Sequence, residues 1–414
     1  MRVYPYVYLA TRAMFQSQGA ALIEMARSLG ASRWLLARDI TLPLARPAIA
    51  AGLALAMLEA LNDIGASEYL GVRTLTLSIF DTWLNRSSLP GAAQIACFML
   101  IVIGGLIALE RYGRRRQQFT GHDRHPGISR RIPLHGRWKW LATAACLLPV
   151  SFGFLIPLCY LTLDVIGRAL AVGFDAELIG HTISTVTIAA FATALTLVLG
   201  FGVVFALRLV RRGYAQACVF VASLGYAVPG TVLALGLLSP MVAVDEGINW
   251  LTRTVAGVNV GLIIAGSSTA VVIAYTIRFL AIATGFAQAG LARISTELDD
   301  AARSVGTRPS GVVWSIQLPL MRPVLWGAAL LIFVDCLKEL PATLLLRPLN
   351  VETLSTYIYQ FATRGSFEEG ALAALIIVLV GIFPVIRMVR HADEVTRQIA
   401  PPAQPLESAD GARV

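Results

Sequence analysis

Charged side chains are scarce in this sequence of 414 residues. Asp, Glu, Lys and Arg make up 14% of the chain and hydrophobic residues 56%, whereas an ordinary soluble domain carries about 25% charge. These proportions argue against a soluble globular protein and exclude a disordered chain, which needs low hydrophobicity. The five cysteines include no Cys-x-x-Cys pair, so neither a disulfide-stapled secreted domain nor a redox or zinc motif is predicted.

Two further kinds of motif are missing. No Gly-x-x-x-x-Gly-Lys-Ser/Thr phosphate loop occurs in the chain, so we expect it to lack an ATPase site of its own. His122 and His125 lie among arginines in a linker, and we interpret them as loop residues. We assign no metal site, no catalytic residue and no cofactor bound by this chain, and a membrane-embedded enzyme is disfavoured because no convergent acid, base or metal set is found.

Long apolar runs dominate what is present. At 1.5 Å per residue, about 20 residues cross the ~30 Å core of a bilayer. The runs therefore predict an all-α, polytopic membrane protein, and an apolar stretch at 3–15 is too short to span. The expected spanning helices cover residues 47–69, 92–110, 139–163, 180–207, 215–240, 259–288, 323–346 and 371–390.

Positive charge gathers in two connecting segments. The chain has a net charge of +9, and Arg and Lys crowd the linker at 111–138 and the loop at 208–214. The positive-inside rule places such loops in the cytoplasm. We therefore interpret the charge as a topology signal, expect no nucleic-acid partner, and place the segments 16–46 and 289–322 and the C-terminus in the cytoplasm.

An internal repeat relates the two ends of the chain. One register aligns 24–30 (Glu-Met-Ala-Arg-Ser-Leu-Gly) with 300–306 (Asp-Ala-Ala-Arg-Ser-Val-Gly), and 40–47 with 316–323. Two copies of one unit in the same orientation are thus predicted. Further along, the aligned pairs are Glu59 with Asp335, Asp63 with Glu339 and, one position out of register, Thr76 with Thr353.

The repeat predicts two tandem halves, of which the first is incomplete. Met1 falls where a membrane helix of the first copy should already have begun, so we expect a misassigned start codon, a fragment or a truncated product. The expected divisions are a first half at 1–110, a basic linker at 111–138, a second half with six spanning helices at 139–392, and a cytoplasmic tail at 393–414.

The polar segments at 16–46 and 289–322 share one pattern. An acidic residue is followed by Ala two residues later and Gly six residues later, and then by Ile, Leu and Pro at fixed intervals. Gly30 and Gly306 can adopt the left-handed conformation that ends a helix. The pattern therefore predicts a short helix, a break and a second helix, lying along the membrane surface.

This pattern resembles the signature loop of ABC importer permeases with a type I transmembrane domain. The resemblance implies a bacterial inner-membrane permease whose coupling helices dock onto two copies of a cytoplasmic ABC ATPase, which uses the ATP. It also implies a periplasmic substrate-binding protein and contact with membrane lipid. The coupling residues implied by the resemblance are Glu24, Ala26, Gly30, Pro43, Asp300, Ala302, Gly306 and Pro319.

The stretch from Lys338 to Pro348 resembles that of ferric-iron permeases, as does the stretch at 4–9. The resemblance implies ferric iron as the cargo and a fused two-half architecture. Thiamine, polyamine and phosphonate permeases also have fused halves and stay open as alternatives. Outside this class, an ion-coupled secondary transporter would also use a duplicated helical core and intramembrane charges.

Charges inside expected spanning helices mark a candidate translocation path: Glu59, Asp63, Asp335, Lys338 and Glu339. Each such charge costs about 2.5–3.5 kcal/mol at the middle of a membrane helix, so it should face water or a partner. Carboxylates suit a hard cation such as Fe(III). In the simpler interpretation, Asp335 and Lys338 neutralise each other and Glu339 bonds across helices.

Overall fold

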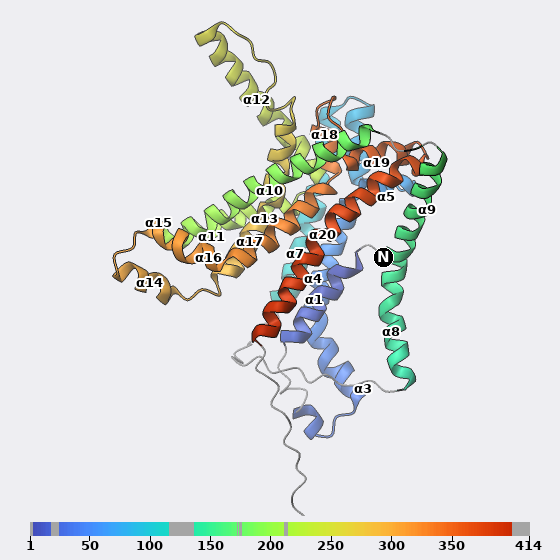
Figure 1. Ribbon diagram of the computed structural model, residues 1–414, viewed down its shortest axis with the longest axis vertical. Helices are drawn as coiled ribbons and strands as arrows, with labels where there is room; N and C mark the ends of the chain where they lie inside the picture. Colours follow the sequence, from blue (N-terminus) through green and yellow to red (C-terminus); the bar gives the residue numbers. More distant parts are fainter. Residues whose placement is uncertain are drawn as a thin grey trace, which may run out of the picture.

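Helices account for all regular secondary structure in the part of the chain that the structure describes (Figure 1). This computed structural model describes residues 3–17, 25–115, 136–171, 173, 176–210 and 214–399. Within these residues, six helices are long and apolar enough to cross a membrane, or seven if the pair at Pro309–Leu320 and Arg322–Leu337, bent by 72°, counts as one span. The predicted all-α, polytopic class is confirmed for these residues.

In the first half, two long apolar helices, α4 and α7, are joined by short ones. α7 is long because no charged residue interrupts the sequence from Leu89 to Leu109. The elements are α1 (Tyr4–Ser17), α3 (Arg33–Leu35), the π-helical turn η1 (Leu36–Thr41), α4 (Leu42–Leu61), α5 (Ile64–Tyr69), α6 (Leu75–Phe80), the π-helical turn η2 (Asp81–Asn85) and α7 (Leu89–Arg115).

The second half contains the longer series of helices. They are α8 (Arg137–Val150), the π-helical turn η3 (Ser151–Leu155), α9 (Ile156–Ala171), α10 (Glu177–Val210), α11 (Tyr214–Ala227), α12 (Gly230–Ala256), α13 (Ser268–Leu291), α14 (Thr296–Ser304), α15 (Pro309–Val312), the π-helical turn η4 (Val313–Gln317), α16 (Leu318–Leu320), α17 (Arg322–Leu337), α18 (Pro341–Leu346), α19 (Leu354–Thr363) and α20 (Phe367–Ile399).

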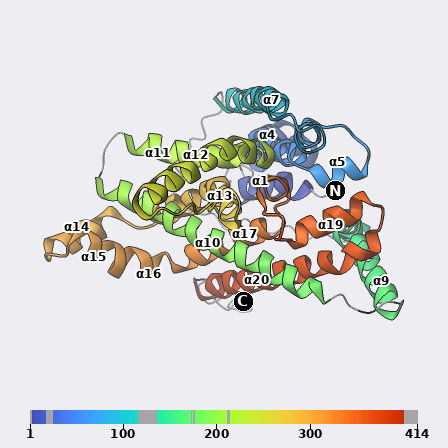
Figure 2. The ribbon, with the colours of Figure 1, turned by 90° about the horizontal axis from the view of Figure 1, so that it is seen from above.

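The core of the second half lies among α10, α13 and α17, which pack side by side, with α11 along α13 (Figures 1 and 2). Tyr275, Ile332 and Cys336 are at most 2% exposed there. Small residues allow close approach, because a Cβ atom at Gly200 of α10 would lie 2.4 Å from the Cβ of Ala283 in α13. Such small-residue contacts are typical of helix packing in membranes.

The two halves pack together around α7 and α5. Val232 and Leu235 of α12 share a buried cluster with Met99 of α7. Further along, α5 packs against α19, where the Tyr359 hydroxyl donates a hydrogen bond to the Glu68 carboxylate. These contacts join the two halves beside the breaks in their central helices.

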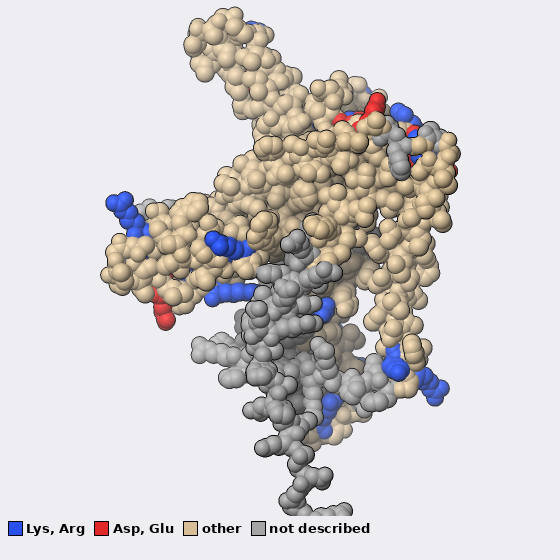
Figure 3. Space-filling view, viewed as in Figure 1, with Lys and Arg blue, Asp and Glu red and all other residues tan. Residues whose placement is uncertain are grey.

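The face seen in Figure 3 is divided by charge. Lys and Arg gather at the end where α14 and α15 lie and near the start of α8, and a mixed group of acidic and basic side chains lies at the opposite end near α18 and α19. The uncovered surface between these two ends is almost free of charge. A broad uncharged band between charged ends is the surface that a bilayer requires.

Two expected helices are each divided into two. The helix expected at 47–69 ends as α4 at Leu61, because the Asp63 side chain caps a new helix, α5. The helix expected at 323–346 ends as α17 at Leu337, and α18 begins at Pro341, whose ring nitrogen cannot donate to the preceding turn. The expectation of continuous spans was wrong at both places.

Two further boundaries also differ from those expected. The helix expected at 215–240 is interrupted at Pro229, and α12 then runs from Gly230 to Ala256. The helix expected at 259–288 begins only at Ser268. The other four expected helices are confirmed within α7, α8 with α9, α10 and α20.

Polar side chains of α12 hold the segment at 257–267 out of helical structure. Both oxygens of the buried Asp245 accept hydrogen bonds from the backbone N–H groups of Ile263, Ile264 and Ala265, at 2.8–3.2 Å. One turn later, Asn249 bonds the backbone at residues 260–261. Because these side chains satisfy the backbone, an apolar segment can leave the helical conformation here.

Candidate functional site

The two helix breaks are built alike. At the first, the Asp63 carboxylate accepts a hydrogen bond from the N–H of Ala66 (3.0 Å) at the start of α5. At the second, the Glu339 carboxylate accepts one from the N–H of Ala342 (3.3 Å) at the start of α18. Each carboxylate satisfies an N–H that has no partner inside its helix. The aligned acids therefore share one structural role.

Both breaks line one cavity of about 390 Å³. Of the five path residues predicted from the sequence, Glu59, Asp63, Lys338 and Glu339 lie along its wall. Asp335 stands behind them, with its carboxylate 2.9 Å from the Nζ atom of Lys338. The fold thus brings together side chains from opposite ends of the sequence, although their part in transport stays a prediction.

Arg278, which sequence reasoning missed, belongs to the same cavity wall. It comes from α13, and its Nη1 atom lies 3.3 Å from Oε1 of Glu339, with both side chains at least nine-tenths buried. A signal was available, because Arg278 is the only charged residue between Ser268 and Leu291. A lone charge inside an apolar span is costly, and such a residue is a candidate for function.

The pairings agree with the simpler interpretation of these charges. Asp335 and Lys338 form an ion pair one turn apart, and Glu339 pairs across helices with Arg278. The same side chains also face the cavity, except for Asp335. Charge pairing and a role in the pathway are therefore compatible at Lys338 and Glu339.

The backbone at the second break is held by hydroxyl groups. The carbonyl oxygen of Glu339 accepts hydrogen bonds from Tyr275 (3.2 Å), Thr343 (2.7 Å) and Ser355 (3.0 Å). The hydroxyls of Tyr275 and Thr343 also lie within hydrogen-bond distance of each other, so one of them shares its proton between the other hydroxyl and the carbonyl. This carbonyl would otherwise lie buried at the end of α17 without a helical partner, so the hydroxyls compensate for the break.

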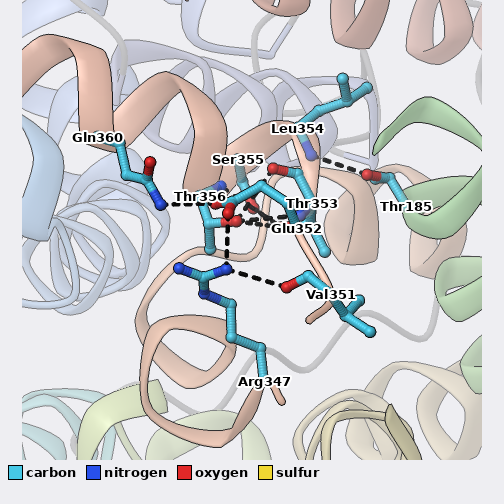
Figure 4. Close-up of polar contacts among 9 residues, drawn as sticks. All are labelled: Thr185, Arg347, Val351, Glu352, Thr353, Leu354, Ser355, Thr356 and Gln360. Carbon is cyan, nitrogen blue, oxygen red and sulfur yellow. Dashed lines mark hydrogen bonds and ion pairs between the residues drawn. The ribbon is translucent and has the colours of Figure 1, made fainter. Parts of the chain in front are cut away.

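The loop between α18 and α19 forms a second polar network beside the cavity, shown in Figure 4. The Arg347 guanidinium donates to the carboxylate of Glu352 (2.8 Å) and to the carbonyl of Val351 (2.9 Å), and Gln360 donates to Glu352 from the other side (3.0 Å). Thr185 of α10 accepts from the N–H of Leu354. The network fixes the start of α19, and with it Ser355, against α10.

The structure corrects the register of the repeat after the breaks. Thr74 caps α6 and Thr353 caps α19, each by accepting a hydrogen bond from an N–H three residues later. Two residues further on, Thr76 donates to the carbonyl of Leu61 and Ser355 donates to that of Glu339. Thr74 rather than Thr76 therefore matches Thr353. The alternation Thr-Leu-Thr-Leu-Ser at 74–78 made both registers plausible.

The coupling segments contain matching helix ends. Gly30 has φ of 83° and Gly306 has φ of 86°, as their predicted role requires. Next to them, the N–H of Ala31 donates to the carbonyl of Ala26 (3.0 Å), and the N–H of Thr307 to that of Ala302 (3.0 Å). These are the bonds of the Schellman motif, so the predicted helix ends are confirmed in both copies.

The remaining predicted coupling residues lie as follows. Pro43 and Pro319 occupy first-turn positions of α4 and α16, each directly after a π-helical turn. Asp300 is exposed on α14. Glu24 lies outside the described residues. Coupling to a partner stays a prediction for all of them.

Only the second coupling segment carries a buried polar anchor, in the part of the chain that the structure describes. Arg208 at the end of α10 donates to the Asp299 carboxylate (2.7 Å) and to the carbonyls of Leu291 (2.8 Å) and Ile294 (3.1 Å). Gln317 donates to the other oxygen of Asp299 (3.0 Å). The anchor ties α14 to a long helix of the core.

Comparison with known proteins agrees with these features. The family described as "Binding-protein-dependent transport system inner membrane component" matches residues 1–118 and 198–398. The first range covers the predicted first half and the second most of the predicted second half. An Fe(3+)-transport system permease protein of Haemophilus influenzae is 25% identical over 409 residues, covering 94% of this chain and 74% of that protein.

Two further proteins are similar to parts of the chain. A putative 2-aminoethylphosphonate transport system permease protein of Salmonella typhimurium is 30% identical over 103 residues, which cover 25% of this chain and 39% of the relative. A chain of the bacterial alginate ABC transporter, solved with a periplasmic protein carrying an alginate pentasaccharide, matches 63% of this chain and 96% of its own, at 17% identity and a TM-score of 0.47. Because the family model matches most of the sequence, this chain belongs to the family of inner-membrane components of binding-protein-dependent transport systems.

Proposed function

We propose that the chain is the permease subunit of an ATP-driven importer and that its cargo is ferric iron. Membership of the family makes the chain a multi-pass inner-membrane permease component. The observation that carries the choice of cargo is the cavity between the two helix breaks, whose wall holds the carboxylates of Glu59, Asp63 and Glu339. Hard trivalent iron prefers oxygen ligands of this kind, and a relative over most of the chain is an Fe(3+)-transport permease.

The charge of the cavity supports a cationic cargo. Among the described residues of its wall, Glu59, Asp63 and Glu339 are acidic, whereas Arg278 and Lys338 are basic. Asp335 adds a further carboxylate directly behind Lys338. Acidic groups therefore outnumber basic ones, and a cation entering the cavity meets a net negative field that the low dielectric of the surroundings strengthens.

We propose that two copies of a cytoplasmic ABC ATPase dock on the coupling segments around Glu24–Gly30 and Asp300–Gly306. Each segment exposes an apolar side chain directly before its glycine, Leu29 at 83% and Val305 at 85% exposure. Large apolar side chains at the exposed tip of a polar helix favour insertion into a cleft of a partner. The ATP is then used by the partner, and this chain binds no cofactor.

The proposed topology places both coupling segments and the C-terminus in the cytoplasm, with a periplasmic binding protein at the opposite end. The gathering of Lys and Arg near α14, α15 and the start of α8 supports this orientation (Figure 3). ATP binding would close the ATPase pair, move the coupling segments and switch the access of the cavity from one side to the other.

The direct test is uptake of radiolabelled ferric iron by iron-limited source cells with and without the gene. A strain whose partner ATPase cannot hydrolyse ATP is the control. We expect uptake to be lost in both mutant strains. Unchanged uptake without the gene, in cells that have no other iron importer, would reject ferric iron as the cargo. Uptake that needs the gene but persists in the ATPase mutant would reject ATP coupling.

The role of the cavity is tested by replacing Glu339 with Gln. Its control is Asp81→Asn, which removes a carboxylate from an arginine pair outside the cavity wall. We expect the cavity variant to change the rate or substrate preference of uptake and the control to change neither. Normal rate and preference in both variants would show that Glu339 serves the fold alone.

A second candidate cargo is a phosphonate. It is favoured by the match to the 2-aminoethylphosphonate permease, which is 30% identical over 103 residues. Labelled 2-aminoethylphosphonate in the same uptake assay separates the two cargoes, because loss of the gene should abolish uptake of the transported compound alone. Thiamine and polyamine stay open without a specific observation in their favour.

A further inference from the structure

The most unusual group in the cavity wall is the guanidinium of Arg278. The residue is 6% exposed, yet its Nε and Nη1 atoms are buried without a hydrogen-bond acceptor. The contact of Nη1 with Glu339 at 3.3 Å is an ion pair that lacks hydrogen-bond geometry. A buried donor without an acceptor destabilises the folded state, and more so when it is charged. Such a group is expected to have a partner at some stage of the transport cycle.

The Glu339 carboxylate is shared between Arg278 and the backbone of α18. Its Oε1 atom, the one nearest to the guanidinium, accepts the N–H of Ala342 at the start of α18. The carboxylate is therefore held as a helix cap. It neutralises the charge of Arg278 but leaves two of its nitrogen atoms without an acceptor.

A second positive feature adjoins the guanidinium. α12 begins at Gly230, and a Cβ atom there would lie only 2.2 Å from Nη1 of Arg278. The helix is 27 residues long, so its N-terminus carries the positive end of a full helix dipole and N–H groups without helical acceptors. The neighbouring Thr231 hydroxyl is also buried without a partner. A cation and a helix N-terminus directed at one place form the recognised arrangement for an oxyanion.

We propose that Arg278, at the N-terminus of α12, binds an oxyanion that is part of the cargo. A phosphate, phosphonate or carboxylate group supplies the acceptors that the guanidinium lacks, with the strength of charge-assisted hydrogen bonds. The wall also holds Glu59 and Asp63, so the cavity suits a cargo with both cationic and anionic parts. This inference rests on the proposed function and refines it: iron passes as a chelate with an oxyanion rather than as the bare ion.

The repeat contains the same residue type at the matching position. The register that aligns the two coupling segments also aligns Arg2 with Arg278. Arg2 is outside the described residues, and the inference rests on Arg278 alone. Both copies therefore have an arginine at this position.

The first experiment measures anion binding directly. The full chain, purified with its ATPase subunits in lipid nanodiscs, is dialysed to equilibrium against ³²P-labelled inorganic phosphate. We expect saturable binding that Arg278→Lys weakens about tenfold or more, because lysine keeps the charge but loses the planar set of donors. The control is Arg86→Lys, at an arginine paired with Asp81 away from the cavity wall, and it should bind phosphate as the unaltered protein does.

Two results of this experiment would overturn the inference. One is the absence of saturable phosphate binding by the unaltered protein. The other is equal binding by the Arg278→Lys and Arg86→Lys variants. Thermal unfolding of each variant shows whether a loss of binding follows from misfolding, and Arg278→Lys with normal unfolding but weakened binding supports the inference.

A transport experiment separates the sources of the anion. Proteoliposomes with the complete transporter receive ⁵⁵Fe(III) with ³²P-phosphate, or ¹⁴C-labelled 2-aminoethylphosphonate. Iron and phosphate entering in a fixed ratio would support the chelate. Phosphonate entering without iron would reject ferric iron and leave the role of Arg278 standing. Iron entering with no labelled anion, at a rate that Arg278→Lys does not change, would reject the anion and leave the proposed function standing.

Discussion

Gly230 gives the sharpest prediction about stability. An alanine Cβ atom at this position would lie 2.2 Å from Nη1 of Arg278, 2.6 Å from Oε1 of Glu339 and 3.1 Å from Cβ of Pro341. Ordinary contacts between such atoms lie near 3.5–4.0 Å, so both charged tips must move by about 1 Å. The replacement therefore acts on the ion pair of the cavity wall.

The size of the effect follows from two opposing contributions. Overpacking a well-packed site costs about 1–3 kcal/mol, and if the buried pair opens the loss rises to about 3–5 kcal/mol. Alanine gains about 0.5–1 kcal/mol over glycine in a helix. We expect Gly230→Ala to lower the free energy of unfolding by about 1–2 kcal/mol if the pair survives, and by more if it does not.

A matched control exists on the same helix. Gly236 also lies in α12, but a Cβ atom there would meet nothing within 4 Å. Gly236→Ala should therefore raise or preserve the thermal unfolding midpoint, measured by tryptophan fluorescence in nanodiscs, while Gly230→Ala lowers it. Equal midpoints for the two variants would refute the packing of Arg278 and Glu339 against Gly230.

Three other predictions concern the coupling segments and the segment that follows α12. Gly306→Val should cost about 1–2 kcal/mol, because a positive φ is strained for any residue with a Cβ atom, and it should reduce uptake per ATP hydrolysed; normal coupling would contradict its assigned role. Asp299→Asn should lower the unfolding midpoint, because it removes the charge of the Arg208 anchor, whereas the exposed Asp300→Asn should leave the midpoint unchanged and weaken ATPase stimulation. The backbone N–H groups at 263–265 donate hydrogen bonds to the Asp245 carboxylate. Asp245→Asn should therefore speed their hydrogen exchange, because the local stability falls by about 1–3 kcal/mol. Equal exchange rates in the Asp245→Asn and Glu246→Gln variants would refute this.

Much of this site was predictable because the internal repeat allows the two copies to be aligned with each other. The repeat pairs Asp63 with Glu339 from the sequence alone, and both carboxylates cap the helix that follows. The glycines at 30 and 306 were likewise predictable, because only glycine takes a positive φ without strain. Local geometry that depends on a few neighbouring residues can be read from such a pattern.

Long-range contacts could not be predicted in the same way. Arg278 and Glu339 lie on different helices far apart in the sequence, and the apolar neighbours of Arg278 gave no indication of its partner. The expected helix at 47–69 is divided because the Asp63 side chain accepts a hydrogen bond from a backbone N–H group. Hydropathy alone does not predict such a contact. The segment at 260–265 is apolar enough for a helix, but Asp245 and Asn249 bind its backbone N–H groups and Gly261 has a positive φ.

The cavity wall is unequal at one matched position, and this has a consequence for how such a transporter can change. Asn62 of the first copy aligns with Lys338 of the second, and both line the cavity. In a transporter made of two identical subunits, one codon would set both positions, so a lysine favourable on one side would be accompanied by a second positive charge opposite. When both copies lie on one chain, the two positions evolve independently. A single substitution can then change the charge on one side of the cavity without changing the other side.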